Sequence, residues 1–155
     1  MKKIDWCKKK EKGIKLIEPN DNLSKEYFQN SEESLKVLKS IKETKSYMWL
    51  ATTKYYIKYF AVYSLLMKIG IKCEIHDCTI ALIAWLENEG LMNKGTAKIL
   101  EADKELRIDN QYYLKNKPVK IDFEELLNFI VSIKEILNKL DDEKITQLRK
   151  KIKEI

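Results

Sequence analysis

The chain has 155 residues, a hydrophobic fraction of 45%, and only four glycines and two prolines. This composition excludes a disordered, collagen-like or turn-rich all-β protein, and the longest apolar stretch, around residues 60–67, is far too short to span a bilayer. No signal peptide opens the sequence, and three cysteines is an odd number in a lysine-rich chain, so we expect a soluble, cytoplasmic protein in a reducing compartment.

The net charge of +6 is concentrated at the two ends of the chain. Residues 1–20 carry seven lysines against three acidic residues, and residues 144–155 carry five basic residues against one acidic residue. The simple interpretation is that both ends are solvated; the alternative is that they contact an acidic partner or the backbone of RNA. Lysines outnumber arginines fourteen to one, which argues against dedicated bidentate recognition of phosphate.

The chain begins with an irregular arm, residues 1–21, for which we predict one short helix around residues 6–12. From Ser24 to Ile41 the apolar residues recur at spacings of three and four, the period of an amphipathic helix. Asn22 or Ser24 is expected to cap its start.

The second predicted helix runs from Tyr47 to Ile69 and ends at Gly70, in the position where glycine is preferred. It is apolar around most of its circumference, which is typical of a helix at the centre of a bundle or in an oligomer interface. Its aromatic stripe is wider than one neighbouring helix requires and consists of Tyr55, Tyr56, Tyr59, Phe60 and Tyr63.

Further helices are predicted over residues 78–89, from Asn93 or Thr96 to about residues 111–114, and over residues 123–140 and 145–155, with Asp77 and Asp122 as the caps of the first and third. No segment predicts a strand. The sequence therefore predicts an all-α, antiparallel up-and-down bundle of four to five core helices. We divide the chain into the arm (1–21), the bundle (22–140) and an amphipathic basic helical tail (141–155).

The cysteines and the single histidine form the sequence Cys73-x-x-His76-x-Cys78, with Cys7 as a fourth potential ligand. The spacing matches no standard zinc pattern, so we expect free, buried cysteines and no metal. His76 precedes a helix N-terminus, where the dipole favours a neutral imidazole; we interpret it as structural.

Arg107 is one of only two arginines, and it lies near the end of a helix beside polar amides and two phenols, in Arg-Ile-Asp-Asn-Gln-Tyr-Tyr. Such a guanidinium suits a phosphate or a partner's carboxylate. Alternatively, it interacts with the last carbonyls of its own helix.

Four segments are informative together: residues 27–38, with Ser31 where alanine is usual; residues 49–56, ending in two tyrosines; residues 65–70, a leucine-rich helix end followed by glycine; and residues 76–82, a histidine that leads into a helix. In order and spacing they resemble the HEPN superfamily (higher eukaryotes and prokaryotes nucleotide-binding domain). The resemblance covers about residues 24–140.

The resemblance implies a two-fold homodimer, with Tyr56, Tyr59 and Tyr63 as candidates for its interface. Many members of the family are toxins encoded beside a minimal nucleotidyltransferase that acts as the antitoxin. Active members are metal-independent ribonucleases with an Arg-x(4–6)-His motif, in which the arginine stabilises phosphorane charge and the histidine takes a proton from the attacking hydroxyl. No cofactor is implied.

Arg107 matches the arginine of that motif, but Tyr112 and Tyr113 stand where the histidine is expected. A phenol with a pKa of about 10 is a poor general base, so the candidate catalytic pair, Arg107 and Tyr112, forms a degenerate Arg-x4-Tyr motif. In some pairs of this family the nucleotidyltransferase adds AMP to a tyrosine beside the motif. Tyr112 and Tyr113 are the candidates for this modification; ordinary packing at the helix end is the alternative.

We therefore expect the toxin-type component of a HEPN/minimal-nucleotidyltransferase pair. One alternative is a non-catalytic subunit that presents a nucleotide or substrate pocket to a nucleotidyltransferase, and another is a weak metal-independent ribonuclease. The expected partners are a second copy of the chain and the nucleotidyltransferase, with RNA for a nuclease and no membrane.

Overall fold

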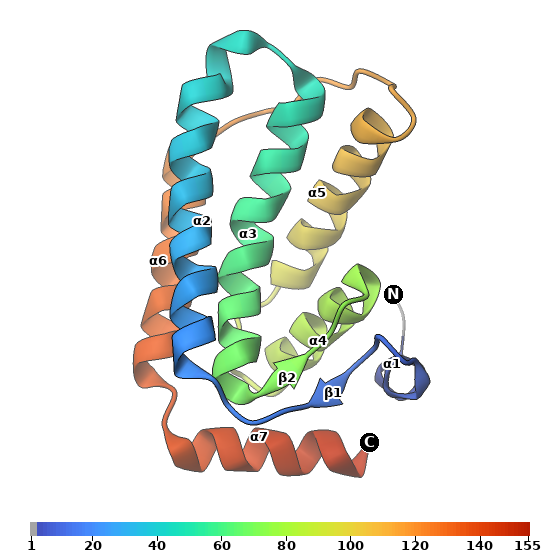
Figure 1. Cartoon of the computed structure of the whole chain (residues 1–155), viewed down its shortest axis with the longest axis vertical. Coiled ribbons are helices and arrows are strands. Elements are labelled where there is room, and N and C mark those ends of the chain that lie inside the picture. The colour runs from blue at the N-terminus through green and yellow to red at the C-terminus, as the bar shows by residue number, and fades with distance from the viewer. Residues whose placement is uncertain (1–2) are drawn as a thin grey trace.

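The computed structural model describes residues 3–155, so residues 1 and 2 of the predicted arm lie outside the described residues. The described chain is predominantly helical (Figure 1). Its helices are α1 (Ile4–Lys9), α2 (Asp21–Ile41), α3 (Tyr47–Ile69), α4 (His76–Asn88), α5 (Thr96–Gln111), α6 (Phe123–Lys139) and α7 (Asp142–Glu154), with a short 3-10 helix at Lys42–Thr44. The predicted all-α bundle is confirmed. Within residues 3–155, no helix combines the length and the low polarity that a membrane span requires.

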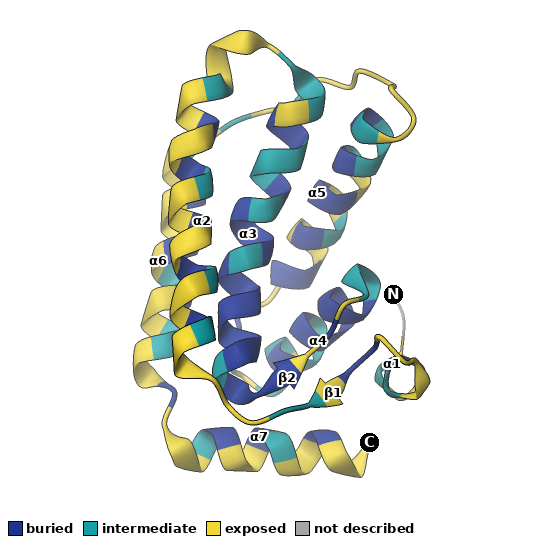
Figure 2. Ribbon diagram, viewed as in Figure 1, coloured by how far each residue is buried: buried dark blue, intermediate teal, exposed yellow. Residues whose placement is uncertain are grey.

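Helix α3 is the central element of the bundle, as its apolar sequence predicts. Fourteen of its 23 residues are buried, and α2, α5 and α6 pack around it. Figure 2 shows the contrast with α2, which buries one stripe and exposes the rest. The buried stripe of α2 contains Phe28, Leu35 and Leu38, the helical spacing read from the sequence.

The helix starts agree with the prediction less well than the helices themselves. The side chain of Asn20, rather than Asn22 or Ser24, caps α2 by accepting a hydrogen bond from Leu23 N. The Ser24 hydroxyl is buried and donates to Ser64 O at 2.7 Å. This bond connects α2 to α3, and the Ser24 hydroxyl therefore does not cap α2.

The predicted caps of α4 and α6 have different outcomes. The Asp122 carboxylate accepts from Glu125 N at 3.1 Å, so the predicted cap of α6 is correct. Helix α4, however, begins at His76, and its N-cap residue Ile75 provides no side-chain cap. Asp77 therefore lies inside the first turn, and its carboxylate pairs with Lys104 on α5.

Helix α7 lies across one end of the bundle (Figure 1) and is held there by Arg149. Its Nη1 donates to Ile17 O, Ile69 O and Gly70 O at 2.7, 3.0 and 2.9 Å. Gly70 ends α3 with a left-handed φ of 82°, which favours glycine. A Cβ on Gly70 would lie 2.5 Å from the backbone oxygen of Ile17 and 2.9 Å from Pro19 N, so the close approach of the arm also requires glycine.

The N-terminal arm is more ordered than its sequence indicates. Strand β1 (Lys15–Leu16) pairs antiparallel with β2 (Ile71–Lys72), and neither is long enough to produce an alternating pattern. Cys7 on α1 forms a disulfide with Cys78 on α4. The prediction of three free cysteines is therefore wrong for this pair, whose members are 71 residues apart in sequence.

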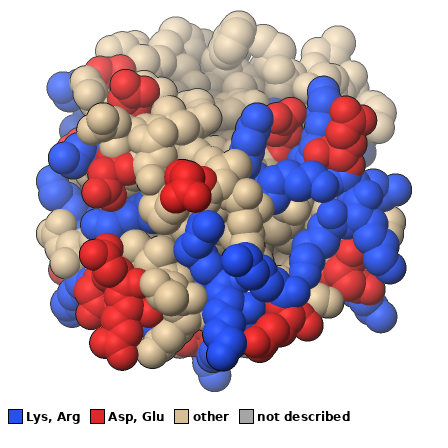
Figure 3. All heavy atoms as spheres, turned by 60° about the horizontal axis from the view of Figure 1, so that its bottom comes forward, with Lys and Arg blue, Asp and Glu red and all other residues tan. Residues whose placement is uncertain are grey.

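The two basic ends of the chain meet on one surface. The Lys8 ammonium donates to Ile152 O at 2.8 Å and to Lys153 O at 3.3 Å. A lysine of the arm thus satisfies carbonyls at the C-terminus of α7, where a cation is favoured by the helix dipole. Figure 3, which brings this end of the molecule forward, shows many lysine and arginine side chains gathered on it.

Candidate functional site

Helix α5 presents a buried face that is polar. Asp103, Lys104, Arg107 and Asn110 are all buried, and spacings of three and four place them on one side of the helix, toward α3 and α4. Among these four residues, only Arg107 is identified from the sequence as a candidate. The other three could have been found from their helical spacing. They were missed because a polar stripe normally indicates the solvent face of a helix.

Arg107 is held among the aromatic side chains of α3. Its Nη1 donates to the Tyr56 hydroxyl at 3.2 Å. Its Cζ lies 4.8 Å from the centroid of the Tyr55 ring and 5.5 Å from that of the Tyr56 ring, distances that allow cation–π attraction. Within residues 3–155, neither the buried Nε of Arg107 nor the buried Oε1 of Gln111, one turn later, has a hydrogen-bond partner.

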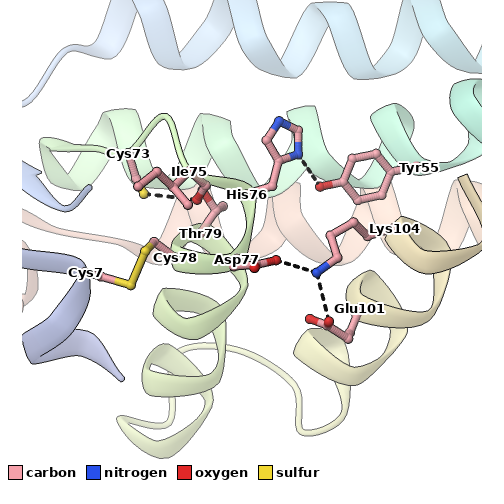
Figure 4. Close-up of polar contacts among 10 residues, drawn as sticks. All are labelled: Cys7, Tyr55, Cys73, Ile75, His76, Asp77, Cys78, Thr79, Glu101 and Lys104. Atoms are coloured by element: carbon pink, nitrogen blue, oxygen red, sulfur yellow. Dashed lines mark hydrogen bonds and ion pairs between the residues drawn. A yellow bond between two sulfur atoms is a disulfide. The ribbon is translucent and has the colours of Figure 1, made fainter. Parts of the chain in front are cut away.

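The other buried cations near Arg107 are paired with carboxylates. Lys58 Nζ lies 2.9 Å from Asp103 and 3.2 Å from Glu125, and Lys104 pairs with Asp77 and Glu101 (Figure 4). Arg107 has no carboxylate partner among the described residues. Its guanidinium contacts only neutral groups, the Tyr56 hydroxyl and two aromatic rings, so it is the cation of this group whose charge no carboxylate compensates.

His76, at the start of α4, closes the aromatic cluster. Its Nδ1 lies 2.7 Å from the hydroxyl of Tyr55 (Figure 4), and its ring stacks on Tyr59 with centroids 4.4 Å apart. Burial lowers the pKa of His76, and the charges of Arg107 and Lys104 lower it further. The imidazole is therefore neutral near pH 7.

The hydrogen bond from Tyr55 also determines the tautomer of His76. Tyr55 is fully buried, and burial raises the pKa of its phenol, which stays protonated. A buried hydroxyl must donate, and His76 Nδ1 is its partner; the proton of the ring then resides on Nε2. His76 can donate from Nε2 but cannot act as a base there, which supports its interpretation as structural.

Tyr112 and Tyr113 follow the last residue of α5 and point into solvent. They are 65% and 67% exposed, whereas each of the other six tyrosines is buried or partly buried. At about 100° per residue, five positions rotate a side chain by about 140° around a helix. Arg107 and Tyr112 therefore do not share a face: the arginine lies inside the bundle and the phenol outside it.

The loop after Tyr113 is fixed by the end of α5. The Asn110 side chain donates to Lys117 O at 2.9 Å and accepts from Lys117 N at 2.7 Å. Asp109 pairs with Lys115 at 3.0 Å and also with Lys117. These contacts hold the two exposed tyrosines on an ordered turn.

The three tyrosines predicted for a dimer interface differ in exposure. Tyr59 and Tyr63 are 7% and 6% exposed, because Tyr59 stacks on His76 and the Tyr63 hydroxyl donates to Cys73 O at 2.9 Å. Tyr56 is half-buried and packs against Phe60, which is also partly exposed. The aromatic surface of α3 that remains accessible is therefore centred on Tyr56.

The cysteines and His76 do not converge on a metal position. Cys7 and Cys78 are bonded to each other, and the buried Cys73 thiol donates to Ile75 O at 3.4 Å (Figure 4). Over the described part of the chain, no three histidine, cysteine or acidic side chains are placed to hold an ion.

One of the comparisons with known proteins bears on this architecture. Comparison with curated proteins and with solved structures finds no match. The family model of the HEPN domain matches residues 24–151. The match spans all of α3, α4, α5 and α6, and it continues into α7, beyond the segments that carry the resemblance in the sequence. The chain therefore belongs to the HEPN domain family.

Proposed function

We propose that this protein is the toxin-type component of a HEPN/nucleotidyltransferase pair, and that the partner enzyme regulates it by adding AMP to Tyr112 or Tyr113. One observation carries the proposal: these two phenols are the exposed ones among eight tyrosines. They sit on an ordered turn directly after the helix that carries Arg107. A macromolecular enzyme can reach these phenols without unfolding the chain.

The proposed transfer is a nucleophilic substitution at phosphorus. The tyrosine oxygen attacks the α-phosphorus of ATP, the bond to pyrophosphate breaks, and a base of the partner enzyme takes the phenolic proton. The products are adenylyl-tyrosine and pyrophosphate. The substrate hydroxyl must enter another protein's active site, so its exposure is a requirement of the step.

The degenerate motif supports a regulated binding function over ordinary ribonuclease chemistry. Tyr112 replaces the motif histidine on the outer side of α5, while the single histidine, His76, is neutral with its Nδ1 bonded to Tyr55. Neither group is suited to take a proton from a hydroxyl near pH 7. The uncompensated Arg107 remains as a group that can stabilise an anion.

We also propose that two copies associate through the accessible aromatic surface of α3, at Tyr56 and Phe60. Aromatic side chains are enriched in the cores of protein interfaces, and these two are partly exposed in the single chain. Light scattering at micromolar concentration tests this directly: a dimer that a Phe60→Lys variant converts to a monomer is expected. A wild-type monomer would refute the proposed dimer.

The test of function measures intact mass and RNA cleavage on the same purified protein, with and without a minimal nucleotidyltransferase and ATP. We expect the mass to rise by one adenylyl group, and the Tyr112→Phe/Tyr113→Phe double variant to abolish the increase. Tyr47→Phe, on a half-buried tyrosine, is the matched control and should leave it unchanged.

The remaining outcomes separate the alternatives. Cleavage of RNA by the protein alone, lost in Arg107→Ala, would replace the proposal with a weak metal-independent ribonuclease. Stable binding to the nucleotidyltransferase with neither added mass nor cleavage would indicate a non-catalytic subunit that presents a pocket to that enzyme.

A further inference from the structure

One end of the molecule carries the entire positive net charge of the chain. We call this surface the basic end and define it as residues 3–16 together with residues 149–155. The first segment has a net charge of +4 and the second of +3, against +6 for the whole chain. The rest of the molecule is slightly negative. The sequence places these charges at opposite ends of the chain, and the fold brings them onto one surface (Figure 3).

Specific contacts hold the two segments together. Lys8 bonds the last carbonyls of α7, and the disulfide from Cys7 to Cys78 fixes α1 on α4. Arg149 ties α7 to the end of α3. The juxtaposition of the two basic segments is therefore a property of the packed structure rather than of two freely moving tails.

Several lysines of the basic end are exposed and lack a carboxylate. In residues 3–155, Lys9, Lys12, Lys150 and Lys153 are exposed and form no ion pair, whereas Lys151 on the same helix pairs with Glu89. Like charges gathered on one surface repel one another and attract a polyanion. The uncompensated positive potential of this surface can therefore attract an anionic partner.

The chemistry of the surface indicates which polyanion it suits. Trp6 is 37% exposed amid these lysines, and Lys10 Nζ lies 4.6 Å from the centroid of its ring. Aromatic side chains beside a basic track are typical of surfaces that bind single-stranded nucleic acid, because unpaired bases stack on the rings. Lysine is a flexible point charge without a fixed bidentate geometry, which suits a phosphate backbone of any sequence.

An anionic membrane is a poorer fit, although α7 is a basic amphipathic helix. Its apolar residues Ile145, Leu148 and Ile152 are all buried against the bundle. A helix that binds a bilayer surface needs that face free to enter the lipid. Only the charged side of α7 is available.

We propose that the basic end binds the phosphodiester backbone of single-stranded nucleic acid without sequence preference, with a base stacked on Trp6. The lysines of α1 and of the last turns of α7 contact successive phosphates, and the disulfide and Lys8 keep the two groups of lysines in register. The basic end contains no residue of the proposed adenylylation site, so the failure of either proposal leaves the other unaffected.

Fluorescence anisotropy with labelled oligo(U) and oligo(dT) of about 20 nucleotides, over a range of KCl concentrations, tests the proposal. The test variant replaces four exposed lysines of the basic end: Lys9→Gln, Lys12→Gln, Lys150→Gln and Lys153→Gln. The control variant removes the same charge from exposed lysines elsewhere: Lys36→Gln, Lys94→Gln, Lys98→Gln and Lys120→Gln. Circular dichroism verifies that both variants remain folded.

The wild type is expected to bind both oligomers more weakly as salt rises. Each phosphate contact contributes about 0.7 to the slope of log affinity against log salt, so the test variant should lose up to about 3 from that slope. The control should retain the wild-type slope. Trp6→Ala should weaken binding about fivefold or more with the slope unchanged, since stacking is not ionic. The ratio of the oligo(U) and oligo(dT) affinities shows whether the 2′-hydroxyl adds to backbone recognition.

Three results would overturn the proposal. The first is no binding of either oligomer at low salt. The second is an equal loss of slope in the control variant, which would show that binding depends on the net charge of the protein and not on the basic end. The third is tighter binding of poly-glutamate than of either oligomer, which would identify an acidic protein as the partner.

Discussion

Removing Arg149 is expected to release α7 from the end of the bundle. Its Nη1 donates to three carbonyls that belong to the arm and to the end of α3: Ile17 O, Ile69 O and Gly70 O. The side chain thus connects three segments that are distant in sequence. Arg149→Met keeps much of the apolar stem and deletes the donors.

The magnitude follows from the number of donors and from exposure. One hydrogen bond to a charged group contributes about 1.5–3 kcal/mol, and one nitrogen with two protons cannot serve three acceptors at full strength. Gly70 O also accepts from Ile17 N at 2.9 Å, and Arg149 is partly exposed, so water replaces part of the loss. We expect a decrease of about 2–4 kcal/mol in the free energy of unfolding.

Urea unfolding followed by circular dichroism measures this decrease, and hydrogen exchange locates it. The amides of residues 15–17 and of α7 should lose more protection than those in the middle of α3. Lys150→Met, on the exposed neighbour, is the control and should change the free energy by less than about 0.5 kcal/mol. If Arg149→Met were as stable as that control, Arg149 would not be what holds α7 in place.

Three further predictions follow from the same structure. Gly70→Ala should cost about 2–4 kcal/mol in urea unfolding, because its φ is 82° and a Cβ would lie 2.5 Å from the backbone oxygen of Ile17; Gly90→Ala, at a φ of 74° with no described atom within 4 Å of the added Cβ, is the control for backbone strain alone, and equal costs at the two positions would exclude the clash. Lys58→Met should cost about 3 kcal/mol, because it leaves the buried Asp103 carboxylate with Lys54 alone; a neutral result in thermal unfolding would contradict this. The fold lowers the pKa of His76, so the unfolded chain binds a proton more readily, and stability should fall as pH drops below the ordinary value of about 6.5. His76→Gln should flatten that dependence, and an unchanged pH profile would show that His76 is not its source.

Periodicity in the sequence was sufficient to predict the helices and the bundle. The central position of α3 follows from its apolar circumference, and Gly70 and Asp122 terminate and start helices as their local chemistry requires. Such signals lie within one or two turns of the residue that carries them, so a single sequence reveals them. The four segments that resemble the HEPN family are also short stretches that a single sequence reveals, and the match of the HEPN domain model to residues 24–151 confirms the family.

The contacts that define the site and the basic end could not be predicted in this way. They join residues far apart in sequence: Arg107 to Tyr56, Cys7 to Cys78, and Lys8 to the end of α7. From the sequence, the polar stripe of α5 predicts a face that lies toward solvent. The structure shows that this face is buried, because Asp103 pairs with Lys58 on α3 and the aromatic rings of α3 pack against Arg107. By itself the sequence determined which segments are helical and where its charges lie along the chain. Only tertiary packing decided which charges are buried and paired, which tyrosines remain exposed, and that the two basic ends share one surface, because these depend on how helices dock rather than on local spacing.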